Sequence, residues 1–222
     1  MLHHALGIRF VHAAIIRSAA GLRTDAHEVD LATLLERAEI LGRVVELHTR
    51  GEEVSVLPAV AERAPDVAAP FVADHEDGEA LLAEIVALAR TSRTGARVPD
   101  ADDDAARETI AAFATHVLQH AEGEEERLVP ALERLFSPAE QVELMRKLWS
   151  TFSPVQFAAV VPWILEHLDP AQRVTYLRDL HDEMEPEPFA RIRDLVRRQL
   201  PAHVVNAISA ELPSVLFERP VG

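Results

Sequence analysis

The chain has 222 residues, of which 48% are hydrophobic, so it is long enough to bury a sizeable core. Acidic residues outnumber basic ones by 37 to 22, a balance that argues against nucleic acid and anionic membrane surfaces as partners. The absence of cysteine excludes disulfides, thiolate zinc sites, iron–sulfur clusters and cysteine nucleophiles.

The first predicted element is an N-terminal helix with an apolar stripe at helical spacing. The stripe consists of Ile8, His12, Ile15, Ala19 and Leu22. Arg9, His12 and Arg17 interrupt the apolar run, which argues against a signal peptide, and no other stretch is long enough to span a bilayer. We therefore expect a cytoplasmic protein that does not bind a membrane.

Three further long helices are predicted from the same spacing of apolar residues. Their inward stripes are Leu31, Leu34, Ala38, Leu41, Val45, His48 and Glu52; Phe71, His75, Glu79, Leu82, Ile85 and Ala89; and Ile110, Phe113, Val117, His120, Glu124 and Leu128. A polar segment with Gly95 and Pro99 separates the last two helices and is typical of a surface loop. Four long helices with short connections predict an all-α fold, an up-down four-helix bundle over residues 1–136.

Residues 137–222 predict a smaller C-terminal helical extension made of several shorter helices. Ser137-Pro138-Ala139-Glu140 has the residues of a capped helix start, and similar starts follow at Ser153-Pro154 and at Asp169-Pro170-Ala171-Gln172. No element is assigned from Pro201 onward. The extension could serve as a lid, as a homodimer interface or as a surface for another protein.

Two near copies of one motif end the second and fourth predicted helices. HTRGEEVSVLPAV at residues 48–60 and HAEGEEERLVPAL at residues 120–132 share His, Gly, two Glu, Pro and Ala at matching positions. In each copy a histidine precedes a glutamate by four residues, which places both side chains on one helix face with about 5–6 Å between their Cβ atoms. This spacing suits two ligands of one metal ion or of a metal pair.

The face that carries these ligands is also the apolar face, so Glu52 and Glu124 are expected to point into the core. A buried ionised carboxylate costs several kcal/mol unless a cation compensates it, and no inward lysine or arginine is placed to serve both. A metal ion would compensate both carboxylates. A polar-lined bundle without metal is the competing interpretation.

The first and third helices each add an inward histidine, His12 and His75, which completes the pattern His, His-x-x-x-Glu, His, His-x-x-x-Glu. Over residues 5–136 this pattern resembles the hemerythrin-like, or HHE cation-binding, family. The resemblance implies an oxo- or hydroxo-bridged centre of two non-haem iron ions. In that centre His12 and His48 would bind one iron, His75 and His120 would bind the other, and Glu52 and Glu124 would bridge them.

The sequence departs from oxygen-carrying members of that family at Glu79, which stands where those proteins have a second histidine on the third helix. A carboxylate ligand there would favour Fe(III) and weaken the case for reversible dioxygen binding. His116, one turn before His120, is the alternative additional ligand. Either residue could instead hydrogen-bond a ligand without touching the metal. Glu53 and Glu125 are expected to face solvent or a neighbouring helix.

The resemblance implies a di-iron protein that reacts with dioxygen, hydrogen peroxide or nitric oxide in sensing, scavenging or oxidation. If the protein is an enzyme, it would be a di-iron oxidoreductase of peroxidase, catalase-like or oxygen-activating type. The alternatives are a protein that binds oxygen or iron reversibly without turnover, and a metal-dependent module that binds another protein through its C-terminal helices.

Overall fold

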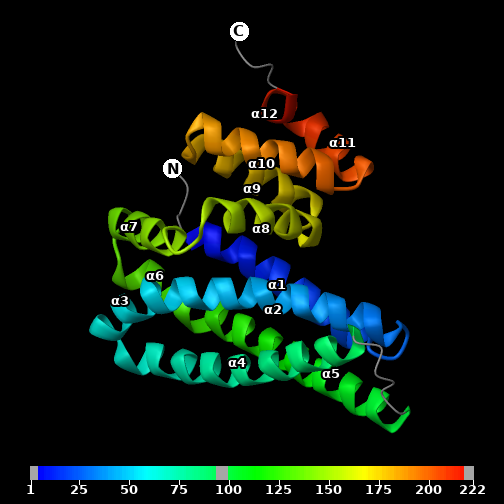
Figure 1. The fold of residues 1–222 in the computed structure, drawn as a ribbon. Helices are drawn as coiled ribbons and strands as arrows, with labels where there is room; N and C mark the ends of the chain where they lie inside the picture. Colours follow the sequence, from blue (N-terminus) through cyan, green and yellow to red (C-terminus); the bar gives the residue numbers. More distant parts are fainter. Residues whose placement is uncertain (1–4, 94–99, 218–222) are drawn as a thin grey trace. The chain divides into compact units, whose positions relative to one another are not determined.

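The structure, a computed structural model, describes residues 5–93 and 100–217, and every regular element within these ranges is a helix (Figure 1). The predicted all-α class is thereby confirmed. The predicted loop with Gly95 and Pro99 lies outside the described residues. Contacts between Cα atoms divide the chain into two compact units, which we call the larger unit (Ile15–Thr151) and the smaller unit (Met1–Ala14 with Phe152–Gly222).

Three long helices form the frame of the larger unit: α2 (Leu31–Val54), α4 (Pro65–Arg93) and α5 (Asp100–Gly123). Each of the three contacts the other two, and successive long helices run in opposite directions (Figure 1). The second half of α1 (Ala5–Asp25) belongs to the same unit. The structure thus contains a helix at each of the four places where a long helix is predicted.

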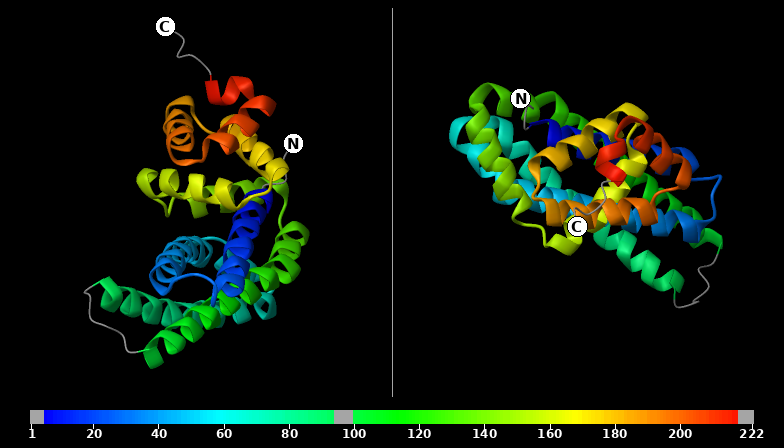
Figure 2. Two further views of the ribbon diagram at one scale, coloured as in Figure 1. Left: turned by 90° about the vertical axis from the view of Figure 1, so that its right-hand side faces the viewer. Right: turned by 90° about the horizontal axis from the view of Figure 1, so that it is seen from above.

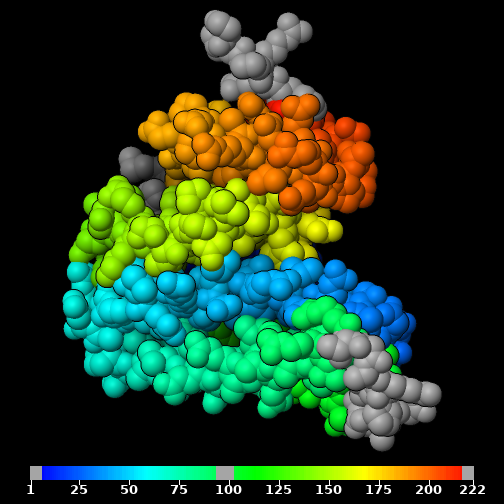
Figure 3. All heavy atoms as spheres, in the orientation of Figure 1, coloured from blue at the N-terminus to red at the C-terminus, as the bar shows by residue number. Residues whose placement is uncertain are grey.

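The predicted apolar stripes of these helices are largely buried, although Leu31, Val45 and Leu82 are half-buried and Glu79 is exposed. Their largest fully buried side chains include Ile15, Leu22, Leu34, Leu41, Phe71, Ile85, Ile110 and Phe113. Full burial of one such side chain stabilises a fold by roughly 1.5–3 kcal/mol, so these residues determine which face of each helix points inward. Figure 3 shows the side chains of α2 and α4 over one side of this unit.

Short helical segments begin within or shortly after the two copies of the repeated motif. They are α3 (Val56–Arg63), the π-helical η1 (Glu124–Leu128), α6 (Val129–Leu135) and α7 (Pro138–Trp149). Helix α7 begins at the predicted cap, where the carboxylate of Glu140 accepts the Ser137 N–H at 2.7 Å. It packs against α2, α3 and α6 within the larger unit.

The smaller unit consists of the first part of α1 and five C-terminal helices. These are α8 (Pro154–His167), α9 (Pro170–Glu183), α10 (Pro186–Gln199), α11 (Ala202–Glu211) and α12 (Pro213–Phe217). The predicted starts at Ser153 and Asp169 are confirmed, because both residues form capping boxes. Figure 2 shows α8 and α10 side by side, as their contacts require. Phe10 lies in the core of this unit, with its ring 5.3 Å from that of Tyr176.

The division into compact units differs from the predicted domains 1–136 and 137–222, because α7 groups with the larger unit and residues 1–14 group with the smaller one. The predicted domain boundary stays a prediction about which parts fold independently. Among the described residues, no single helix is long and apolar enough to cross a membrane, although α7 and α8 taken together would pass by length and composition. The cytoplasmic location also stays a prediction.

Candidate metal centre

The first copy of the motif places His48 and Glu52 in the core of the larger unit. Both residues lie on α2 and are buried, and Nε2 of His48 is 3.4 Å from Oε1 of Glu52. Between them along the helix, Gly51 lies against α7, where a Cβ atom would come within 2.8 Å of Cγ of Leu148. Gly51, the glycine of this copy of the motif, therefore allows α7 to pack closely beside His48 and Glu52.

The second copy repeats the arrangement at the end of α5. His120 and Glu124 are both buried, and Nε2 of His120 is 3.3 Å from Oε1 of Glu124. Each copy thus brings one imidazole and one carboxylate together within a single helical turn, as the spacing of four residues predicts.

The two carboxylates divide their oxygens between two sides of the site. On one side, His48 Nε2 faces Glu52 Oε1 at 3.4 Å and Glu124 Oε2 at 3.6 Å. On the other side, His75 Nε2 is 3.7 Å from Glu52 Oε2, and His120 Nε2 is 3.3 Å from Glu124 Oε1. An arrangement in which each carboxylate offers one oxygen to each side is suited to a pair of metal ions bridged by both glutamates.

The second side contains a complete set of four donors. Glu52, His75, His120 and Glu124 each offer a ligand atom, and these four atoms lie within 4.8 Å of one another. Two imidazoles and two carboxylates suit iron, zinc or manganese. Nε2 of His75 and Nε2 of His120 are buried and have no hydrogen-bond partner in the described part of the chain. A metal ion would satisfy both nitrogens, so the residues present fit a metal.

His12, the remaining predicted histidine ligand, is fully buried on α1. It belongs to residues 1–14, which group with the smaller unit, whereas His48 belongs to the larger unit. Ligation of a metal by His12 and His48 together therefore stays a prediction.

A proline follows Glu52 and Glu124 in each copy of the motif, and it explains why the helix changes beyond the glutamate. Proline has no N–H, and its ring clashes with the carbonyl four residues earlier, so it disrupts a regular helix at that point. For Pro58 the carbonyl four residues earlier is that of Val54, where α2 ends. For Pro130 it is that of Glu126, in the middle of η1. π-Helical segments are frequent at functional sites. The repeated motif thus includes both the ligands and the residue that distorts the helix after them.

Burial and mutual repulsion make the charged site unfavourable without a cation. Burial and the nearby charge of Glu124 raise the pKa of Glu52 well above its ordinary value. Burial, with a contribution from His120, lowers the pKa of His75. Burial alone would also lower the pKa of His120, but attraction to Glu124 and Asp74 outweighs it and raises the pKa. A metal ion would lower the pKa of Glu52 again, since it stabilises the ionised carboxylate.

Glu53 contacts one of the histidines of the cluster, a contact that the sequence did not reveal. Its Oε1 lies 3.0 Å from Nδ1 of His75, although 44% of its side chain is exposed. Because a carboxylate accepts hydrogen bonds, Nδ1 of His75 carries the proton and Nε2 presents its lone pair to the metal position. The expectation that Glu53 faces solvent or a neighbouring helix did not include this contact. The adjacent second glutamate in both copies of the motif is the signal that could have suggested it.

Replacement of Glu53 by alanine is expected to weaken metal binding about 10- to 100-fold without removing a ligand, because His75 loses the group that orients it. A competition titration against a chelator would measure the change. The matched control is Glu62→Ala, which removes an exposed carboxylate from the neighbouring helix α3. Equal affinities in the two variants would contradict the role of Glu53.

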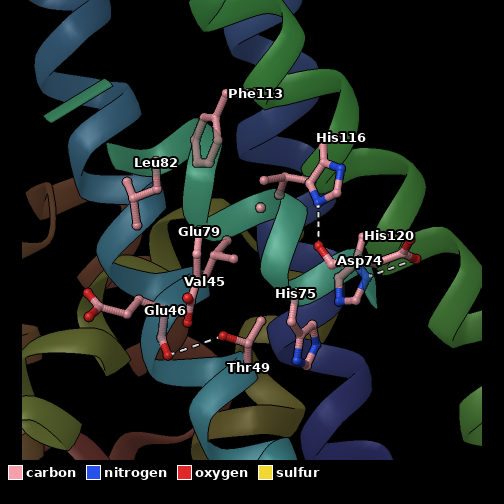
Figure 4. A pocket seen from close by; sticks show the side chains of 12 residues that line it. Val45, Glu46, Thr49, Asp74, His75, Glu79, Leu82, Phe113, His116 and His120 are labelled. Atoms are coloured by element: carbon pink, nitrogen blue, oxygen red, sulfur yellow. Dashed lines mark hydrogen bonds and ion pairs between the residues drawn. The ribbon is translucent and has the colours of Figure 1, made fainter. Parts of the chain in front are cut away.

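A pocket opens beside the second side of the site (Figure 4). Glu79 lines this pocket but is exposed, and it does not belong to the groups of metal-ligand atoms. His116 also lines it, and its Nε2 donates a hydrogen bond to the backbone oxygen of Asp74 at 3.0 Å. The structure therefore brings neither Glu79 nor His116 into the cluster, and the predicted ligation by one of them stays a prediction.

Comparison with known protein families identifies a match. Residues 7–132 match the family described as "Hemerythrin HHE cation binding domain". No curated protein and no solved structure matched the chain in the same comparisons. The matched residues contain every residue of the cluster described above.

Proposed function

The chain belongs to the hemerythrin HHE cation-binding family, and we propose on that basis that it holds two iron ions bridged by Glu52 and Glu124. In this proposal His12 and His48 bind one ion, and His75 and His120 bind the other. The helix α1 would complete an up-down four-helix bundle with α2, α4 and α5. Glu79 and His116 stay outside the proposed ligand set, because one is exposed and the other is engaged by a backbone oxygen.

One observation carries the two-metal assignment: each bridging carboxylate directs one oxygen to His48 and the other to the side of His75 and His120. Glu52 has Oε1 at 3.4 Å from His48 and Oε2 at 3.7 Å from His75. A single ion would contact imidazoles on one side of the carboxylates only, whereas here each carboxylate faces imidazoles on both sides. The donor types suit several metals, and membership of the family favours iron among them.

We further propose that the centre reacts with dioxygen, hydrogen peroxide or nitric oxide. Bound iron would supply the redox chemistry, whereas the chain supplies ligands and controls access. Glu53 holds the tautomer of His75 through Nδ1. Apolar side chains such as Phe71, which is buried with its ring 5.9 Å from that of His120, limit the contact of the ligands with bulk water.

The stoichiometry tests the proposal directly. Protein purified after expression with iron supplied is expected to contain about two iron atoms per chain, since four imidazoles and two bridging carboxylates exceed the needs of one ion with an open position. Metal analysis by mass spectrometry would measure the ratio. One tightly held zinc ion and no iron would contradict it.

Reversible oxygen binding without turnover is the second candidate function, and the position of Glu79 favours it. The charge argument against a stable oxygen adduct holds only if Glu79 binds the metal. Glu79 is exposed and lies outside the cluster, so this argument does not apply. The lifetime of the visible spectrum after the reduced protein meets dioxygen distinguishes the candidates. Rapid, irreversible oxidation supports reaction, and a spectrum that disappears on removal of oxygen supports reversible binding.

A further inference from the structure

The pocket beside the second side of the site lies entirely within the larger unit, between α2, α4 and α5. Its floor contains four buried residues: His75, Phe113, Val117 and His120. Figure 4 shows His75 and His120 near each other below Asp74, with the exposed Glu79 and the ring of Phe113 farther along the pocket. The pocket therefore ends at the two imidazoles of the second metal position.

The pocket serves one side of the site. It is lined by His75 and His120, whose Nε2 atoms are buried without hydrogen-bond partners among the described residues, whereas His48 does not line it. A molecule that entered it would meet the metal bound by His75 and His120. The two metal positions would thus differ in their access to external ligands.

The volume of the pocket limits the size of that ligand. It is about 30 Å³, which suits a water-sized or diatomic molecule, since one water needs roughly 10–15 Å³ measured in this way. Organic substrates need pockets of several hundred Å³. Val45, Leu82, Phe113 and Val117 form its apolar walls.

The charge of the pocket limits the ligand further. Glu46, Asp74 and Glu79 line it, and Glu46 and Glu79 are exposed at its outer end. Thr49 and His116 are its other polar side chains, and its lining includes no lysine or arginine among the described residues. Carboxylates near a narrow apolar opening repel anions and leave uncharged molecules unaffected.

We propose that this pocket admits small uncharged ligands to the metal held by His75 and His120, and that Glu46 and Glu79 discriminate against anions of similar size. The proposal rests on the proposed function, because it requires a metal at that position. It adds the side of the site at which ligands bind and the charge class that is accepted.

Azide and nitric oxide test the charge discrimination, because one is an anion and the other an uncharged molecule of comparable width. In iron-loaded protein, Glu79→Gln and Glu46→Gln are each expected to tighten azide binding to the oxidised centre about two- to fivefold. Nitric oxide binding to the reduced centre is expected to stay within about twofold of the unaltered protein. The matched control is Glu76→Gln, which removes an exposed carboxylate of α4 that does not line the pocket.

A second pair of variants tests the route. Val45→Phe is expected to fill the pocket and slow the association of both ligands at least about tenfold, while the iron content stays unchanged. Val72→Phe is the control, since Val72 is exposed on α4 outside the pocket. Thr49→Leu offers a milder obstruction from the same wall as Val45 if the larger side chain prevents folding.

The outcomes separate the pocket from the function on which it rests. Metal analysis before any ligand is added would overturn the proposed function, and this proposal with it, if the protein holds fewer than two iron atoms. Iron-loaded protein in which Glu79→Gln and Glu46→Gln leave azide affinity unchanged, or tighten it no more than Glu76→Gln does, would overturn the pocket proposal alone. Loss of iron from Glu79→Gln would also overturn it, because Glu79 would then be a ligand.

Discussion

Glu52→Gln is expected to lower the iron content from about two atoms per chain to one or fewer and to destabilise the iron-loaded protein. Glu52 faces His48 on one side of the site and His75 on the other, so its loss should weaken both of the proposed metal positions. A ligand present at 100 times its dissociation constant stabilises the folded state by about 2.7 kcal/mol. For a chain of this length, a loss of that size lowers Tm by roughly 5–10 °C.

The same substitution is expected to act in the opposite direction on metal-free protein. Burial and the charge of Glu124 raise the pKa of Glu52, which means that the ionised side chain is unfavourable in the folded state without metal. The glutamine amide has a similar shape and no charge, so the metal-free variant should melt at or above the Tm of metal-free unaltered protein at pH 7–8. Thermal melts with and without iron would show whether the order reverses.

Two controls make this reversal specific. Glu62→Gln removes an exposed carboxylate of α3 and should change neither iron content nor Tm. His48→Ala removes a buried ligand that is not a carboxylate, so it should lower the iron content without stabilising metal-free protein. If Glu52→Gln retained two iron atoms and melted as the unaltered protein does, the metal centre would have to lie elsewhere.

Metal uptake is expected to release protons. The affinity for the metal should fall about tenfold for each unit by which the pH is lowered, for each proton that the metal displaces. Glu52 has a raised pKa, and a metal binds only its ionised form. His120 also has a raised pKa and must lose its proton before it can bind. Affinity should therefore rise with pH until both groups are deprotonated. Titration calorimetry in two buffers of different ionisation enthalpy would count the protons.

The raised pKa of Glu52 also determines how the stability of metal-free protein changes with pH. A carboxyl group whose pKa is higher in the folded than in the unfolded state stabilises the fold at pH values below its unfolded pKa, and this contribution is lost as pH rises through the folded value. Metal-free protein should therefore lose the contribution of Glu52 as pH rises above about 4.5. Iron-loaded protein should not lose it, since the metal replaces the proton. Parallel pH profiles of Tm with and without iron would contradict this account.

Local regularities of the sequence were enough to predict several features correctly. Helical periodicity by itself places His48 with Glu52, and His120 with Glu124, on one buried face, and the structure brings each pair within 3.4 Å. The capped helix starts at Ser137, Ser153 and Asp169 were also predictable, because a cap depends only on residues within one turn. The family pattern of histidines and glutamates could also be recognised from the sequence alone, since its elements repeat along the chain.

Other features depend on how helices lie against one another. The sequence predicts Glu79 or His116 as an additional ligand, and only the structure shows that Glu79 is exposed and that His116 bonds to the backbone of Asp74. Glu53 faces a neighbouring helix, as expected, but only the structure shows that its partner there is His75, across the contact between α2 and α4. Residues three or four positions apart share a face by local geometry. Which edge of that face reaches a ligand is decided by the rotation and separation of whole helices, and these are set by the packing of side chains distant in sequence.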